Sequence, residues 1–352
     1  MSGSVFGKEF TISTFGESHG GAVGVVVDGV TPNIELNEED IQIELNKRRP
    51  GQSKITTPRD EADKVQILSG IYEGRTTGTP IMLVVFNKDA KSNAYDNIKD
   101  LFRPGHADYT YLKKYGHRDH RGSGRASGRE TIGRVAAGAI AKKILREKYN
   151  VDITAYTVNV AGIQAQKIDY SEIEKNIVRV ADKNVAEKII EKIGELIKEH
   201  DSIGGIVECT IKGVMPGVGE PTFDKLDADL AKAMLSIGAV KGIEFGAGFA
   251  VAKMSGSENN DWMDKNGFQS NNAGGIIGGI STGQDIVFRV PIKPTSSISK
   301  PQPTLDIHGE EVVCETFGRH DPIICPRAVP VIEAMAAIVI LDHIKRQKAL
   351  HA

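Results

Sequence analysis

Glycine constrains the fold of this chain more than any other residue. The sequence has 38 glycines among 352 residues, many of them in doublets that bound short β-branched runs. Glycine permits positive φ angles and close backbone approach, so such runs are typical of strands that end in tight turns. The pattern predicts strands over residues 9–15, 22–30, 78–86, 151–163, 204–214 and 285–294.

Helical periodicity predicts the other elements. Apolar residues recur at helical spacing from Arg129 to Tyr149, and Ser127 with Glu130 predicts a capping box at that helix start. Residues 87–126 show no sustained period, which predicts a long functional loop with short helical turns. Further helices are expected over 37–49 with Asn37 as cap, twice over 171–200, over 224–239, and over 327–347 with Pro330 in the first turn.

The chain contains no low-complexity linker, so we expect a single compact body of strands and helices over residues 1–352. A glycine doublet, a strand, Gly-Val, a proline and a helix occur near residue 20 and again near residue 204. Either an internal duplication, roughly 10–150 and 200–345, or shared turn chemistry explains this echo.

Composition excludes several classes of protein. The net charge of −2 argues against a nucleic-acid binder, and the apolar run at 334–341 is too short to span a membrane. The first ten residues lack the apolar core of a signal peptide. Three widely spaced cysteines fit a reducing compartment, so we expect a cytoplasmic protein without disulfides. We expect no metal; His117 and His120 are the weak alternative.

Positive charge gathers in the segment 118–130, where four arginines and three glycines precede the predicted helix. A helix start presents N–H groups and positive partial charge, and Arg125 and Arg129 flank it. An anion site is one interpretation, and a capped helix with solvated arginines is the other. Arg48, Arg49 and Lys54 lie in a second basic segment, either a mobile lip over an anionic substrate or cations that favour a helix end.

Histidines in glycine-rich loops are candidates for acid–base chemistry. Ser18 and His19 lie within Gly-Glu-Ser-His-Gly, which matches the nucleophile elbow of hydrolases but precedes a strand where the elbow needs a helix. We therefore expect a tight turn that presents both side chains in a pocket, with a serine hydrolase as the alternative. His106 follows Pro-Gly, and Asp321 follows Arg-His, where it is either a proton-relay base or a surface ion pair.

Two further segments suit a flat or phosphorylated ligand. Residues 293–304 offer many hydroxyls on a stiff, proline-rich backbone. Residues 273–283 resemble a dinucleotide loop, but no helix follows, so the dinucleotide-binding fingerprint fails.

Seven of these segments together resemble the chorismate synthase family, in order and spacing, from about Phe6 to Arg346. They read FGESHG, FRPGHADYTY, GSGRASGRETIGRVAAGAIA, SIGAVKGIEFGAGF, NAGGIIGGISTG, KPTSSI and GRHDPIICPRAVPVIEAM. The resemblance implies a duplicated β–α sandwich with helices packed between or against mainly antiparallel sheets, and a homotetramer. It also implies a phosphate lyase that converts 5-enolpyruvylshikimate 3-phosphate to chorismate by 1,4-anti elimination, with reduced FMN and no net redox change. NADPH is a possible reductant.

The resemblance also implies residue roles. His19 protonates the departing phosphate, His106 supports the charge of the reduced flavin near its N1/C2 edge, and Asp321 works with flavin N5 in taking the C6 proton. Flavin contacts map to Arg125, Ala126, Ser127, Gly238, Ala239, Gly278, Lys293, Pro294, Thr295, Ser296, Ser297 and Arg319. Substrate or NADPH contacts map to Ser18, Arg48, Arg49, Lys54 and Arg129.

Three positions depart from the common pattern of the family: Lys54 replaces an arginine, Ala126 a serine and Gly238 an asparagine. The first change weakens a bidentate contact. A phosphoanion- or flavin-binding protein without catalysis is the alternative function.

Overall fold

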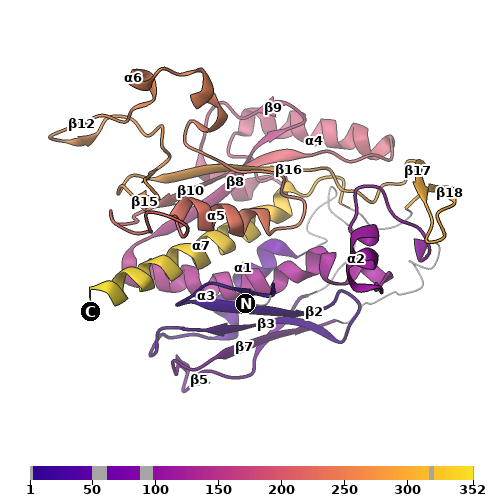
Figure 1. Cartoon of the computed structure of the whole chain (residues 1–352), viewed down its shortest axis with the longest axis horizontal. Coiled ribbons are helices and arrows are strands. Elements are labelled where there is room, and N and C mark those ends of the chain that lie inside the picture. The colour runs from indigo at the N-terminus through magenta and orange to yellow at the C-terminus, as the bar shows by residue number, and fades with distance from the viewer. Residues whose placement is uncertain (1–2, 50–61, 88–97, 317–320, 352) are drawn as a thin grey trace.

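Two five-stranded antiparallel sheets enclose a layer of helices (Figure 1). The structure is a computed structural model that describes residues 3–49, 62–87, 98–316 and 321–351. The first sheet has the order β1 (Val5–Phe6), β2 (Thr11–Gly16), β3 (Ala22–Asp28), β7 (Ile81–Phe86), β4 (Val65–Ile67). The second has the order β11 (Glu244–Phe245), β16 (Ile286–Ile292), β10 (Gly205–Lys212), β8 (Asp152–Val160), β9 (Ile163–Gln164).

The helices between the sheets are α1 (Glu38–Arg48), α3 (Thr131–Tyr149), α5 (Leu226–Leu235) and α7 (Cys325–Leu350). Helix α3 packs against β2, β3 and β7, and α7 packs against β8 and β10. The predicted strands and the sandwich of helices and antiparallel sheets are therefore confirmed. The remaining helices and strands lie outside these layers. The helices are α2 (Asp108–Tyr115), α4 (Lys183–Lys198) and α6 (Gly256–Asn259). The strands form four pairs: β5 (Ile71–Tyr72) with β6 (Arg75–Thr76), β12 (Met263–Asp264) with β13 (Gly267–Phe268), β14 (Ile276–Ile277) with β15 (Ile280–Ser281), and β17 (Gln302–Leu305) with β18 (Glu311–Cys314).

Helices α3 and α7 cross at very short range. A Cβ atom added to Gly138 of α3 would overlap the Cβ and Cα atoms of Ala334 on α7. Both residues lie in the buried core, where the closeness of the two backbones leaves no room for a larger side chain. This contact fixes the separation of the two helices on which the sheets rest.

Helix α7 starts earlier than the pattern indicates, at Cys325, so Pro330 lies past its first turn. Proline has no N–H, which leaves the carbonyl of residue 326 without its usual helical donor. Arg179 supplies one instead: its Nη1 donates to the Pro326 carbonyl at 2.9 Å. A buried arginine from a distant loop therefore compensates for the proline.

Two further helix predictions are wrong in detail. The segment 171–200 contains one α-helix, α4, preceded by a 3₁₀ turn over Tyr170–Lys175. Ser127 accepts from the backbone N–H of Arg129 at 3.3 Å, but the Glu130 carboxylate does not complete the capping box. That carboxylate accepts from Thr14 Oγ1 at 2.9 Å and Arg134 Nε at 2.8 Å, because tertiary partners outcompete the local cap. Asn37 does form a capping box, with Asp40.

Candidate active site

The turn between β2 and β3 carries Ser18 and His19, which are 1% and 9% exposed. It faces the 3₁₀ segment Arg121–Ala126, where Gly122 has a φ of 57°. A Cβ atom on Gly122 would overlap the His19 ring and contact Ser18 Oγ. The imidazole of His19 therefore packs directly on the Gly122 backbone. Strand β3 follows the turn, so the hydrolase elbow is not formed.

Arg125 ties the end of β2 to the same 3₁₀ segment. Its guanidinium donates to the carbonyls of Gly16 and Thr14, both at 3.2 Å, and to Thr14 Oγ1 at 2.7 Å. Ser127 then starts the next short turn, Gly128–Glu130, which leads into α3. Arg125 also lies 3.7 Å from the Glu130 carboxylate, which it shares with Arg134, so the helix start carries two arginines against one carboxylate.

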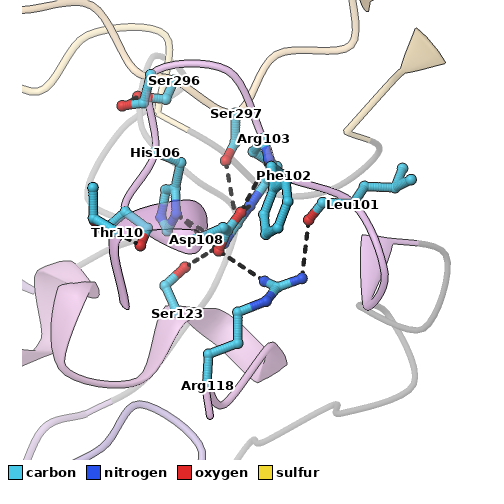
Figure 2. Close-up of polar contacts among 12 residues, drawn as sticks. Leu101, Phe102, Arg103, His106, Asp108, Thr110, Arg118, Ser123, Ser296 and Ser297 are labelled. Atoms are coloured by element: carbon cyan, nitrogen blue, oxygen red, sulfur yellow. Dashed lines mark hydrogen bonds and ion pairs between the residues drawn. The ribbon is translucent and has the colours of Figure 1, made fainter. Parts of the chain in front are cut away.

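His106 lies in a cluster built around the buried carboxylate of Asp108 (Figure 2). Arg103 donates to both carboxylate oxygens, from Nε at 2.7 Å and from Nη2 at 2.8 Å, and Arg118 Nη1 lies 3.0 Å from Oδ1. His106 Nδ1 lies 3.1 Å from both Arg103 Nη2 and Asp108 Oδ1. Arg103 Nη2 also donates to Ser123 Oγ at 2.9 Å, next to the Gly122 that contacts His19.

These contacts set the charges of the cluster. The Asp108 pKa lies far below its usual value: burial raises it, but the interactions with Arg103 and His106 more than offset that rise. The His106 pKa is lowered, chiefly by burial and also by the charges of Arg103 and Lys293, although its contact with Asp108 opposes the shift. His106 is therefore neutral at neutral pH, beside an ionised carboxylate and two arginines.

The loop after β16 joins this cluster from the other sheet. Lys293 Nζ donates to the carbonyl of Gly105 at 2.8 Å, and Ser296 Oγ donates to the same carbonyl at 2.7 Å. Ser297 Oγ lies 3.5 Å from Arg103 Nη1. The backbone N–H of Lys293 donates to the Ala239 carbonyl at 2.9 Å, which places the turn at 238–239 beside the same loop.

Asp321 lies on the other side of that loop. Its backbone carbonyl accepts from Thr295 Oγ1 at 2.6 Å, and its carboxylate forms an ion pair with Arg327 at the start of α7. Arg327 Nε lies 3.3 Å from the carbonyl of Arg48, at the end of α1. The aspartate is therefore connected both to the loop 293–297 after β16 and to the basic end of α1.

Arg48 is buried, with 1% exposure, instead of lying on an exposed lip. It donates to Asp63 at 3.1 Å, and Arg129 donates to the other oxygen of Asp63 at 3.0 Å. Arg129 Nε also donates to Asn87 Oδ1 at 2.9 Å. The Asn87 amide in turn donates to the carbonyls of residues 17 and 20, at 3.0 and 2.8 Å, on either side of His19.

A closed chain of contacts, partly polar and partly between residues that are neighbours in sequence or in van der Waals contact, thus connects all three predicted catalytic residues. It passes from the His19 turn through Asn87, Arg129, Asp63, Arg48 and Arg327 to Asp321, then through Thr295, Ser297 and Arg103 to His106 and Ser123. Gly122, the residue before Ser123, returns the chain to His19.

Gly278 lies apart from the other residues to which the family resemblance assigns flavin contacts. It sits in the turn between β14 and β15, and the neighbouring Gly279 carbonyl accepts from Leu226 at the start of α5. Residues 238–239 follow the other end of α5, and a ten-residue helix spans about 15 Å. Arg49 is half-buried at the end of α1, while Lys54 and Arg319 lie outside the described residues.

Sequence reasoning missed Arg103, Asp108, Arg118, Asp63 and Arg327. A signal existed for the first two, because Arg103 and Asp108 lie three residues before and two after His106. Asp63 had none, since its arginine partners lie 15 and 66 residues away in the chain.

The site has donors for a ligand that carries several negative charges. Ser18 Oγ is buried and has no hydrogen-bond partner among the described residues. A Cβ added to Gly238 would meet no atom within 4 Å, so there is open space beside that backbone. Within the described ranges, no group of three His, Cys, Asp or Glu side chains is placed to hold a metal ion. No helix in those ranges is both long and apolar enough to cross a bilayer.

The fold and the site together define a class of protein: an α+β sandwich that brings histidines, carboxylates and several arginines together beside glycine-rich loops. A sequence model of the chorismate synthase family matches residues 10–345. The chorismate synthase of Methanosarcina mazei is 56% identical over 98% of this chain and 97% of its own length. That of Methanococcoides burtonii is 54% identical over 100% and 98%. A solved structure titled "Crystal Structure of Chorismate Synthase" superposes with a TM-score of 0.78 and 30% identity, over 97% of this chain and 93% of that chain.

The chain therefore belongs to the chorismate synthase family. The family is a group of lyases that convert 5-enolpyruvylshikimate 3-phosphate to chorismate in the shikimate pathway, which leads to the aromatic amino acids. The family uses reduced FMN. The predicted family, fold class and reaction are thereby confirmed.

Proposed function

We propose that the closed chain of contacts described above surrounds the site where this protein eliminates phosphate, with His19, His106 and Asp321 as its catalytic residues. The observation that supports the proposal is the closure itself, which links three residues that are far apart in the sequence. Side chains packed among fixed neighbours keep their geometry, and positioning is the protein's main contribution when a cofactor carries the difficult chemistry.

The residues around the loop 293–297 fit an FMN site. Lys293 and Arg125 supply positive charge, the Ser297 hydroxyl, which accepts from Arg103, keeps its own hydrogen to donate, and the space beside Gly238 admits a flat ring next to backbone. When bound, reduced FMN supplies electron density that assists loss of phosphate without net redox change. Gly238 lacks the side-chain amide of the asparagine that is common in the family, and this leaves room for the ring to approach the backbone more closely.

Proton transfer in this proposal is divided between two places. The His19 imidazole gives a proton to an oxygen of the departing phosphate, and the neighbouring Ser18 hydroxyl donates a hydrogen bond to the same group. The Asp321 carboxylate accepts the proton that leaves C6 of the substrate. Arg327 forms an ion pair with that carboxylate and so fixes its position at the start of α7.

The substrate's phosphate and two carboxylates need cations that stay charged. Arg48 and Arg129 share Asp63, so this group of three carries a net positive charge, and Arg49 lies next to it in sequence. Lys54 lies in the same basic segment, outside the described residues. We propose that this group attracts the substrate chiefly through its field, since both buried arginines already donate to a carboxylate.

Four finer points rest on the resemblance. NADPH is a reductant for the flavin, and the protein acts in the cytoplasm. The chain is a single domain that arose by duplication of segments near 10–150 and 200–345. It assembles as a homotetramer, which exposed apolar side chains support: Phe223, Phe249 and Trp262 are 96%, 83% and 61% exposed.

The direct test is an anaerobic assay of chorismate formation from 5-enolpyruvylshikimate 3-phosphate and FMN. We expect product with dithionite in the wild type, and little in the Asp321→Asn variant. Product with NADPH alone would establish that the protein reduces its own flavin. A non-catalytic phosphoanion binder would bind substrate and FMN but give no chorismate in any of these mixtures, and that result would overturn the proposal.

A further inference from the structure

We propose that Arg103 is a positioning residue that holds His106 as the neutral tautomer with its proton on Nε2. The inference deepens the proposed function, on which it depends only for its catalytic consequence. It starts from a count of donors and acceptors around Nδ1 of His106. Two groups lie 3.1 Å from that atom: Nη2 of Arg103, which can only donate, and Oδ1 of Asp108, which can only accept when ionised.

The carboxylate of Asp108 has no acceptor site left for a proton on Nδ1. Oδ2 accepts from Arg103 Nε at 2.7 Å and from the Arg103 backbone N–H at 3.2 Å. Oδ1 accepts from Arg103 Nη2 at 2.8 Å and is in contact with Arg118 Nη1 at 3.0 Å. A carboxylate has about four lone-pair sites, and these four donors occupy them.

The guanidinium of Arg103, in contrast, always carries its hydrogens. One hydrogen on Nη2 is directed to Asp108, and the second is shared between Ser123 Oγ at 2.9 Å and His106 Nδ1 at 3.1 Å. Nδ1 therefore acts as the acceptor, and the proton of the neutral ring lies on Nε2. The lowered pKa of His106 agrees, because burial disfavours the imidazolium and the charges of Arg103 and Lys293 add to that effect.

The charged groups around the ring have opposite effects on its protonation. Arg103 and Lys293 oppose a second proton on the ring, and Asp108 favours it, although Arg103 and Arg118 both neutralise that carboxylate. Nε2 has no hydrogen-bond partner among the described residues, and the side chain keeps 16% exposure. The ring therefore presents an N–H donor without a full charge, which suits a ligand edge that becomes more negative during the reaction.

The test is nitrogen NMR on the full chain labelled with ¹⁵N-histidine, without FMN, at neutral pH. The His106 signals are assigned by their loss in His106→Gln. We expect a protonated, pyrrole-type Nε2 and a pyridine-type Nδ1. A protonated Nδ1, or an imidazolium, would overturn the proposal, and this result needs no variant at Arg103.

Two variants sharpen the test. In Arg103→Lys a single ammonium replaces the forked guanidinium, which releases an acceptor site on Asp108. The tautomer of His106 with its proton on Nδ1 should then appear, and the rate of chorismate formation should fall about tenfold or more. Arg121→Lys, on the exposed ion pair with Asp119 in the neighbouring turn, should change neither. An unchanged tautomer and rate in Arg103→Lys would contradict the positioning role. Absence of chorismate formation in the wild type would instead contradict the proposed function and leave the tautomer result standing.

Discussion

Two buried aspartates in this protein each bind two arginines, yet the two clusters differ in how far apart in sequence the partners lie. Asp108 takes Arg103 from five residues away, within one loop and the start of α2. Asp63 takes Arg48 and Arg129 from 15 and 66 residues away, and joins the end of α1 to the start of α3. The first cluster orients a histidine, and the second holds the walls of the site together. Similar chemistry thus serves orientation in one place and assembly in the other.

The largest expected effect concerns the histidines on the two sides of the site. We expect His19→Ala and His106→Ala each to reduce chorismate formation by roughly 10²–10⁴-fold, since general acid–base groups contribute on that scale. The assay uses pre-reduced FMN under anaerobic conditions, so that flavin reduction is not measured. His308→Ala, on an exposed turn, is the control and should keep full rate. Full activity in either variant would remove that residue from the mechanism.

The next effect compares the two aspartates directly. Asp63→Ala and Asp108→Ala should each lower the free energy of unfolding by about 3–5 kcal/mol, because each leaves buried arginine charge without its carboxylate. Urea denaturation measures the loss. Asp152→Ala, on an exposed ion pair with Arg146, should cost at most about 1 kcal/mol. If Asp63→Ala were as mild as that control, the assembly role of its cluster would be wrong.

The smallest expected effect distinguishes the two serine hydroxyls that accept hydrogen bonds from Arg103. Ser123 Oγ lies 2.9 Å from Nη2, whereas Ser297 Oγ lies 3.5 Å from Nη1, at the limit of a hydrogen bond. Ser123→Ala should reduce the free energy of unfolding by about 1 kcal/mol and Ser297→Ala by less. The two denaturation midpoints, measured without FMN, decide the order. The reverse order would mean that the loop 293–297 binds Arg103 more tightly than the structure indicates.

Sequence patterns predicted most of the fold, and the reason is periodicity. The strand of alternating buried valines at Val23, Val25 and Val27 and the apolar stripe of α3 are local patterns that report which face meets the core. The predictions failed where a tertiary partner replaced a local one. Glu130 binds Thr14 and Arg134 instead of capping its own helix, and Arg179 allows Pro330 inside α7.

The candidate site was predicted only in part. Motifs pointed to His19, His106 and Asp321 as candidates, because glycines and prolines mark loops, where functional side chains are common. They did not predict that Arg48 is buried against a carboxylate, and they offered no sign of Asp63. An ion pair across 66 residues leaves no local pattern.

By itself, the sequence determined the family, the strands and helices, and the loop residues that we propose as catalytic, because these depend on residue type and short spacing. Tertiary structure alone decided which arginine meets which carboxylate and which atom faces His106 Nδ1. The physical reason is that a buried donor without an acceptor costs free energy. It is therefore paired with whichever acceptor the fold brings within about 3 Å, regardless of distance along the chain.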